Sequence, residues 1–221
     1  MAETTYNLGE FEVVTFELGM ALTNTYLIGR PGRDHAVVID PAWQGERIAS
    51  AARERDWRIG SIWLTHAHFD HFGGAAGVAN AYDIPVPVAL HEQDLPLWRA
   101  MGGAAFFGFE AFDPGPEPTI DLNHGMVLKL GEIEFEVRHT PGHSLGHVIL
   151  VASDLGAVFC GDLIFQGSVG RTDLPGGSWE ILLKSIQDEI LILPDETQLY
   201  PGHGPPTSVG YERQHNPFLQ V

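Results

Sequence analysis

The sequence predicts an α/β fold in which two β-sheets pack face to face and helices cover their outer sides. Three observations lead to this prediction. Short apolar runs alternate with segments of helical spacing in the first half of the chain, the second half repeats the pattern, and no linker separates the halves. The chain has 221 residues, of which 44% are hydrophobic, so we expect a single domain with a sizeable core over residues 1–221.

In the first half, strands and helices are expected in turn. The apolar run at 24–28 leads into a Gly-Arg-Pro-Gly turn, and the run at 36–40 is ended by Pro41. Helix formers with apolar residues spaced near 3.6 occupy 45–57. The elements expected in this half are strands at 11–16, 24–28, 36–40, 61–64 and 86–90, and helices at 45–57 and 73–82.

A stretch rich in Gly, Phe and Pro covers residues 101–123. A loop of this length without structure of its own is usually functional or mobile. Its phenylalanines, which include Phe106, Phe107 and Phe109, either form an aromatic wall for a substrate or pack on the core. The composition does not choose between these two roles.

The second half rebuilds the pattern of paired strands and flanking helices. Turns are expected at Gly131 and Gly156, and Ser178 is a suitable N-cap for a helix with Glu180 in its first turn. The elements expected in this half are strands at 127–130, 133–137, 147–151, 158–160 and 197–200, and a helix at 178–190.

The charge of the chain argues against two classes of partner. There are 29 acidic residues against 12 basic ones, for a formal net charge of -17. Such a field repels phosphate backbones and anionic membrane surfaces, so we expect neither nucleic acid nor membrane as a partner.

The cysteine content and the N-terminal sequence indicate the cellular compartment in which the protein is expected. Cys160 is the only cysteine, so an intrachain disulfide and a thiolate-rich zinc site are both excluded. The start of the chain is polar and lacks the apolar core of a secretory signal, and no apolar run approaches the roughly 20 residues that a membrane span needs. We therefore expect a cytoplasmic protein.

Residues 65–74 carry four metal-capable side chains within six positions: His66, His68, Asp70 and His71. The segment follows an apolar run, so we expect it on the loop between a strand and a helix. Imidazole nitrogen and carboxylate oxygen are ligands that suit a zinc-like divalent ion. On such a loop the first two histidines can converge on one ion, while Asp70 and His71 can turn toward a second.

Three later residues, His143, Asp162 and His203, each follow a predicted strand. Both histidines stand in a Pro-Gly-His sequence, in which Pro and Gly fix a tight turn and leave the imidazole projecting. An isolated histidine is more often a satisfied polar residue than a ligand. Together with the segment at 65–74, however, these residues predict a metal site.

The seven residues match, in order, the metal motif of the metallo-β-lactamase-fold hydrolases, which the chain resembles over about its whole length. The resemblance implies a four-layer αβ/βα sandwich with a dinuclear site at one edge. It also implies two divalent metal ions, with zinc expected and iron or manganese as alternatives. By this match the first metal would be held by His66, His68 and His143, the second by Asp70, His71 and His203, and Asp162 would bridge both.

The chemistry that this match implies is hydrolysis. A water between two cations loses a proton near neutral pH and becomes the nucleophile, so neither a serine nor a cysteine nucleophile is needed. Asp70 and Asp162 would be the catalytic carboxylates that hold this metal-bound hydroxide. The ions would also polarise the substrate carbonyl and stabilise its developing oxyanion.

Residues 161–177 and 212–219 resemble the short bacterial form of the glyoxalase II-like enzymes, which hydrolyse hydroxyacyl thioesters of glutathione. This resemblance implies a small-molecule acyl thioester such as S-lactoylglutathione as the substrate. Arg171 falls where the longer enzymes have a lysine that contacts glutathione, so we expect it to bind a substrate carboxylate. A structural ion pair with Asp173 is the alternative.

The chain departs from the longer enzymes in two respects. It stops about 18 residues past His203, so no separate C-terminal helical substrate domain is expected. Pro205 and Asp173 stand where those enzymes have tyrosines. Recognition of glutathione therefore does not follow from the resemblance, and the thiol carrier and the oligomeric state stay open.

Two other classes of function are compatible with these ligands. Persulfide dioxygenases also resemble the chain, with one iron on the equivalents of His66, His143 and Asp162. Here the segment 170–173 continues as Leu-Pro-Gly-Gly where the dioxygenase pattern has Phe-Gln, which favours the hydrolase. A non-enzymatic metal-binding protein is the third class.

Overall fold

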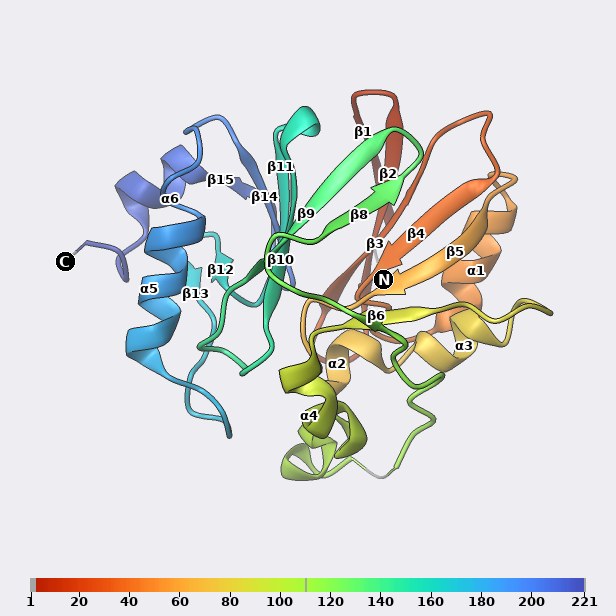
Figure 1. The fold of residues 1–221 in the computed structure, drawn as a ribbon, viewed down its shortest axis with the longest axis horizontal. Helices are drawn as coiled ribbons and strands as arrows, with labels where there is room; N and C mark the ends of the chain where they lie inside the picture. The colour runs from red at the N-terminus through yellow and green to blue at the C-terminus, as the bar shows by residue number, and fades with distance from the viewer. Residues whose placement is uncertain (1–2, 110, 221) are drawn as a thin grey trace. The chain divides into compact units, whose positions relative to one another are not determined.

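The computed structural model describes residues 3–109 and 111–220, in which the chain forms two compact units, Met1–Asp121 and Leu122–Val221. Each unit is built on one mixed β-sheet with helices beside it (Figure 1). The predicted α/β class is confirmed, and the two sheets correspond to the two halves of the sequence. Among the described residues, no helix has the length and apolar character needed to cross a membrane.

The first unit contains a seven-stranded sheet whose strands follow one another in chain order. The pairs from β1 to β4 are antiparallel, and those from β4 to β7 are parallel. The strands are β1 (Glu3–Leu8), β2 (Phe11–Leu18), β3 (Thr23–Gly29), β4 (His35–Ile39), β5 (Arg58–Trp63), β6 (Val88–Leu90) and β7 (Ile120–Asp121).

Parallel strands need a crossover, and α1 (Gly45–Arg53) supplies the one between β4 and β5. It begins at Gly45, where a Cβ atom would lie 2.0 Å from the carbonyl oxygen of Gly74, so only glycine allows α1 and α3 (Ala75–Ala79) to pack together as Figure 1 shows. The helix ends earlier than the expected residue 57, because Asp56 adopts a left-handed φ of 57° and the chain turns back into β5.

The segment expected as a long loop at 101–123 is partly regular. It begins with a 3-10 helix, η2 (Met101–Phe107), and ends with β7, while residue 110 lies outside the described part of the chain. The sequence analysis also missed the short helices before it, η1 (Glu92–Asp94) and α4 (Leu95–Arg99). A helix of one or two turns is too short for its apolar residues to show the helical period of 3.6 in the sequence.

The second unit contains a six-stranded sheet of order β15-β14-β11-β10-β9-β8, in which only the pair β11–β14 is parallel. Helices α5 and α6 cover one face of this sheet through a core that includes Leu182, Val158 and Leu199. Ser178 is the N-cap residue of α5 as predicted, although its side chain makes no capping hydrogen bond. The elements are β8 (Val127–Leu130), β9 (Ile133–His139), β10 (Val148–Ala152), η3 (Ser153–Leu155), β11 (Ala157–Gly161), β12 (Ile164–Phe165), β13 (Ser168–Val169), α5 (Trp179–Glu189), β14 (Gln198–Pro201), β15 (Thr207–Ser208) and α6 (Val209–His215).

Candidate metal centre

The four candidate ligands of the first unit lie together on the loop after β5 and on the short helix α2 (Phe69–Phe72). The ring centroids of His66 and His71 are 4.0 Å apart, and those of His66 and His68 are 4.9 Å apart. These three histidines and Asp70 are buried. A loop at the carboxyl end of a parallel strand is a usual place for a ligand site in α/β sheets.

Asp40, at the end of β4, orients two of these histidines. Its Oδ2 atom lies 2.9 Å from His71 Nδ1 and accepts a hydrogen bond of 2.6 Å from the Thr65 hydroxyl. The Thr65 hydroxyl donates its one proton to Asp40. It can therefore only accept a hydrogen bond from His66 Nδ1, which lies 3.0 Å away. Both rings are then protonated at Nδ1, which makes Nε2 the atom that can bind a metal.

Two further carboxylates shape the same loop. Asp70 Oδ2 accepts a hydrogen bond of 3.0 Å from the Thr23 hydroxyl on β3 and lies 3.6 Å from His71 Nε2. The buried Asp94 accepts a hydrogen bond of 3.0 Å from the backbone N–H of Ala67, between the first two histidines. The loop is therefore held from β3 and from η1.

The three candidate ligands of the second unit also lie together. His143 follows β9, Asp162 follows β11 and His203 follows β14. Strands β11 and β14 are parallel neighbours, so their carboxyl ends meet at one edge. Asp162 Oδ2 lies 3.5 Å from His143 Nε2 and 3.4 Å from His203 Nε2.

These spacings fit the chemistry of a bound metal. Two ligand atoms of a tetrahedral zinc ion, each about 2.0–2.2 Å from the metal, lie about 3.3–3.6 Å apart. The three distances from Asp70 to His71 and from Asp162 to His143 and His203 are 3.4–3.6 Å, too long for strong hydrogen bonds. The donor set within each unit therefore suits a divalent ion.

Backbone and side-chain groups of the second unit orient its candidate ligands. His143 Nδ1 lies 2.8 Å from the carbonyl oxygen of Arg171, which again leaves Nε2 as the atom that could bind a metal. The buried His147 accepts a hydrogen bond of 3.1 Å from the backbone N–H of Asp162, and its Nδ1 lies 2.9 Å from the Thr140 hydroxyl. His147 thus fixes the backbone that carries Asp162.

The Arg171 side chain forms the ion pair that was the alternative in the sequence analysis. Its Nε and Nη2 atoms donate to the two carboxylate oxygens of Asp173 at 2.7 and 2.8 Å. The hydrogen bond from Arg171 lowers the pKa of Asp173 to about 2 and raises the pKa of Arg171. Both side chains are exposed, so a substrate carboxylate would have to compete with Asp173.

Cys160 is buried at the end of β11, and its Sγ lies 3.6 Å from the carbonyl oxygen of Ile164. Burial raises the pKa of its thiol, with a further contribution from the nearby charge of Asp162. It is therefore a protonated core residue at neutral pH.

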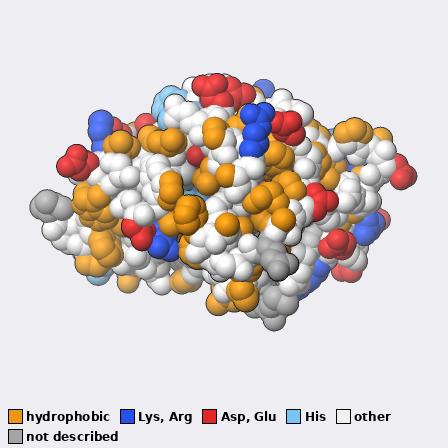
Figure 2. All heavy atoms as spheres, turned by 90° about the horizontal axis from the view of Figure 1, so that it is seen from below, with side chains coloured by type: hydrophobic (Ala, Val, Ile, Leu, Met, Phe, Trp, Pro, Cys, Tyr) orange, Lys and Arg blue, Asp and Glu red, His pale blue; other side chains and the backbone are white. Residues whose placement is uncertain are grey.

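Of the two roles expected for the phenylalanines of the 101–123 segment, the structure shows packing against other aromatic side chains for three of them. Phe107 and Phe109 pack against Phe69 of α2 with ring centroids 5.3 and 4.9 Å apart, and Phe112 packs against Phe72 at 5.4 Å. Phe106 instead is 72% exposed. Figure 2 shows one face of the molecule, on which exposed hydrophobic side chains lie among acidic and basic ones.

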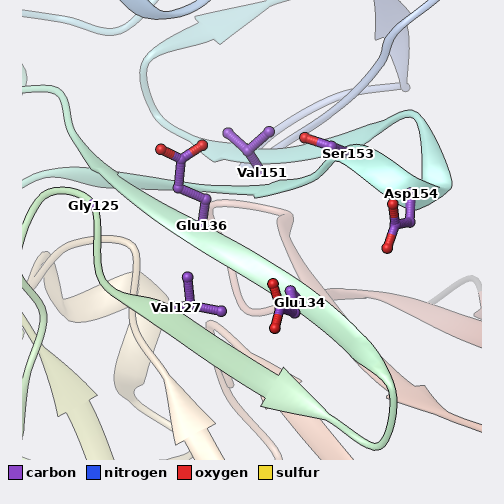
Figure 3. Close-up of a pocket in the computed structure, with 7 residues that line it drawn as sticks. All are labelled: Gly125, Val127, Glu134, Glu136, Val151, Ser153 and Asp154. Atoms are coloured by element: carbon purple, nitrogen blue, oxygen red, sulfur yellow. The ribbon is translucent and has the colours of Figure 1, made fainter.

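A separate hollow lies over β8, β9 and β10 in the second unit (Figure 3). Its acidic side chains are Glu134, Glu136 and Asp154. Glu134 pairs with Lys129 and Glu136 pairs with Arg138. The described residues that line it include no candidate ligand, so this hollow is distinct from the candidate metal centre.

Comparison with known proteins defines the family. The model of the metallo-beta-lactamase superfamily matches residues 18–203. The chain belongs to this superfamily. The matched range contains all the candidate ligands, from the histidine segment at 66–71 to His203.

Two curated relatives are similar to this chain over most of its length. "Probable metallo-hydrolase YqgX" of Bacillus subtilis is 37% identical over 84% of this chain and 88% of its own length. "Hydroxyacylglutathione hydrolase GloC" of Haemophilus influenzae is 34% identical over 84% of this chain and 87% of its own length.

Two solved structures share the metallo-beta-lactamase fold with this chain. BLEG-1, described as a B3 metallo-beta-lactamase, has a TM-score of 0.87 and 35% identity, covering 96% of this chain and 100% of its own. TTHA1623, in a di-iron-bound form, has a TM-score of 0.82 and 41% identity, covering 93% of this chain and 99% of its own.

All seven predicted ligands thus fall into two compact groups, one in each unit. The sequence analysis missed Asp40, Asp94 and His147, which hold the ligand-bearing backbone or rings. Asp40 offered one signal, because it is an acidic residue at the end of a buried strand. Thr65, next to His66 in the sequence, is the hydrogen-bond partner of that ring.

Proposed function

We propose that the protein is a metal-dependent hydrolase that cleaves acyl thioesters, with S-lactoylglutathione as the representative substrate. Membership of the metallo-beta-lactamase superfamily supports the metal-dependent chemistry. The names of the YqgX and GloC relatives support hydrolysis, and that of GloC supports a thioester of glutathione.

The observation that carries the proposal is the position of Asp162 Oδ2, 3.5 Å from His143 Nε2 and 3.4 Å from His203 Nε2. A carboxylate oxygen at ligand spacing from two imidazoles is suited to bridge two ions. We propose that His66, His68 and His143 hold the first ion and Asp70, His71 and His203 hold the second. Zinc is the expected metal, with iron or manganese as alternatives.

Two bound ions would supply a water with a lowered pKa and would polarise the thioester carbonyl. The residues of the chain would orient the histidine rings that bind these ions. Asp40 and Thr65 keep Nε2 of His71 and His66 as the ligand atoms, and Arg171 O does the same for His143. Neutral imidazoles with fixed rings bind a cation without first losing a proton.

Arg171 is the proposed contact for a negatively charged part of the substrate. It lies on the segment that follows Asp162, and its guanidinium is about half exposed. A planar guanidinium can bind a carboxylate through two hydrogen bonds, as it does with Asp173. An anionic thioester would then share or displace Asp173.

A persulfide dioxygenase is the alternative function. The di-iron-bound form of TTHA1623 supports one requirement of this function, because it shows that a protein of 41% identity binds iron. Two histidines and one carboxylate, here His66, His143 and Asp162, are the usual ligands of a mononuclear iron that activates dioxygen.

Metal analysis of the purified protein followed by parallel assays tests the proposal. Hydrolysis would be measured with S-lactoylglutathione, oxygen uptake with glutathione persulfide and β-lactam cleavage with a chromogenic cephalosporin. We expect thioester hydrolysis that is lost, together with bound metal, in His66→Ala and Asp162→Ala. Oxygen uptake or β-lactam cleavage without thioester hydrolysis would contradict it.

A further inference from the structure

Glu212 of α6 is a completely buried carboxylate whose two oxygens both act as acceptors. Oε2 accepts hydrogen bonds from the backbone N–H of Gly167 at 2.9 Å and from Asn216 Nδ2 at 2.8 Å. Oε1 accepts one from the Thr207 hydroxyl. Burial of a carboxylate costs folding free energy unless hydrogen-bond donors surround it. The fold therefore needs these contacts.

The partners of Glu212 lie on two segments that follow candidate ligands. Gly167 is in the turn of the β12–β13 hairpin, which begins just after Asp162, and Thr207 opens β15, which follows His203. Asn216 strengthens the first connection, because its Nδ2 atom also donates to the carbonyl oxygen of Ser168 at 2.9 Å. One side-chain pair therefore ties both segments to α6.

The hairpin in turn reaches His143. The N–H of Gly170, just after β13, donates to the carbonyl oxygen of Leu163 at 3.3 Å. A Cβ atom on Gly170 would lie 1.9 Å from the carbonyl oxygen of Asp162, so the chain is closely packed there. The next carbonyl, that of Arg171, is the partner of His143 Nδ1 at 2.8 Å.

We propose that Glu212 and Asn216 are positioning residues that hold the β12–β13 hairpin so that Asp162 and the ring of His143 have the geometry of metal ligands. The proposal rests on the metal-binding role in the proposed function. Neither residue touches a ligand directly; they act through the hairpin backbone.

Arg213, the neighbour of Glu212, provides a matched control. Its guanidinium donates to Asp195 Oδ1 at 3.0 Å and to the carbonyl oxygens of Leu191 and Leu193 at 3.0 and 3.3 Å. Arg213→Ala therefore removes hydrogen bonds of the same helix without touching the hairpin or β15. It reports what general loosening of α6 does to the protein.

The experiment compares Glu212→Ala, Asn216→Ala and Arg213→Ala with the wild type. Zinc is titrated into each metal-free protein by calorimetry. Because loss of a group that orients a metal ligand weakens binding by about 10–100-fold, we expect Kd to be at least about tenfold higher in the first two variants than in Arg213→Ala. A smaller ratio of the Kd values overturns the proposal. If Glu212→Ala does not fold, the comparison of Asn216→Ala with Arg213→Ala alone tests the proposal.

Hydrogen exchange of the metal-free proteins is the second measurement. We expect the amide of Gly170 to exchange faster in Asn216→Ala than in Arg213→Ala, and equal rates would contradict the proposal. If the wild type binds no zinc, iron or manganese, the proposed function fails, and exchange at Gly170 still decides whether the pair holds the hairpin.

Discussion

His71 and Asp40 are joined by a buried hydrogen bond of 2.9 Å between Nδ1 and Oδ2, across 31 residues of sequence. Asp40 has a φ of 47°, in the left-handed region that non-glycine residues rarely adopt. Such a backbone conformation persists only where surrounding contacts favour it, and it occurs often at functional sites. The pair links the end of β4 to the candidate ligands on α2.

Replacement of Asp40 by Asn should weaken metal binding. The carboxylate serves three donors, the hydroxyl and N–H of Thr65 and the ring of His71, whereas an amide has one acceptor oxygen. We expect the Kd for zinc to rise by about 10–100-fold. Calorimetry on the metal-free protein measures it. Asp34→Asn is the control, because its side chain is exposed, and equal Kd values for both variants would contradict the role of Asp40.

Gly102 should tolerate alanine much less well than Gly108. Both have a left-handed φ, 60° and 74°, so both substitutions carry a backbone penalty of about 1–2 kcal/mol. At Gly102 a Cβ atom would also lie 2.2 Å from the backbone nitrogen of Phe69, whereas at Gly108 nothing lies within 4 Å.

We therefore expect Gly102→Ala to lose about 1–3 kcal/mol of unfolding free energy beyond Gly108→Ala. It should also lower metal content, since η2 packs on the histidine loop. Urea unfolding and metal analysis measure the two effects. Equal stabilities of the two variants would show that η2 can move away from Phe69 without cost.

Arg171→Ala should raise KM for an anionic thioester more than it lowers kcat, because it removes the proposed contact with the charged part of the substrate. The unfolding free energy should change little, since the ion pair with Asp173 is exposed and screened by solvent. Asp173→Asn is the matched variant, and it should leave KM equal or lower by releasing Arg171. If both variants raise KM equally, Arg171 acts only through the ion pair.

Cys160 should make the protein less stable at alkaline pH. Burial raises the pKa of its thiol in the folded state, so between about pH 9 and 10.5 the unfolded chain loses a proton that the folded chain keeps. The stabilisation is complete below the ordinary thiol pKa and is lost as pH rises above it. Relative to Cys160→Ala, the wild type should lose up to about 1.4 kcal/mol per pH unit in urea unfolding. Parallel pH profiles would exclude this thiol as the cause.

The grouping of the candidate ligands could be predicted from the sequence because they stand in local motifs at strand ends. His66, His68, Asp70 and His71 lie within one loop and helix, and each Pro-Gly-His sequence follows a strand of the second sheet. The predicted strands and the class of fold follow from apolar runs in the same way. Most elements were found within a few residues, since buried strands are strongly apolar.

The supporting contacts could not be predicted, because each joins residues far apart in the chain. The partners of Glu212 at Gly167 and of Asn216 at Ser168 are 45 and 48 residues away. The strand β1 was missed for a different reason: its side chains are mostly exposed and polar, so it has no apolar run. Pairing with β2, rather than its own composition, makes it a strand.

Titration of the metal-free protein with zinc, with S-lactoylglutathione hydrolysis followed at each addition, tests the central claim most directly. We predict no turnover without metal, and activity that rises until about two ions are bound per chain and then stays constant. Undiminished turnover in the metal-free protein, or binding of zinc without any thioester cleavage, would contradict it.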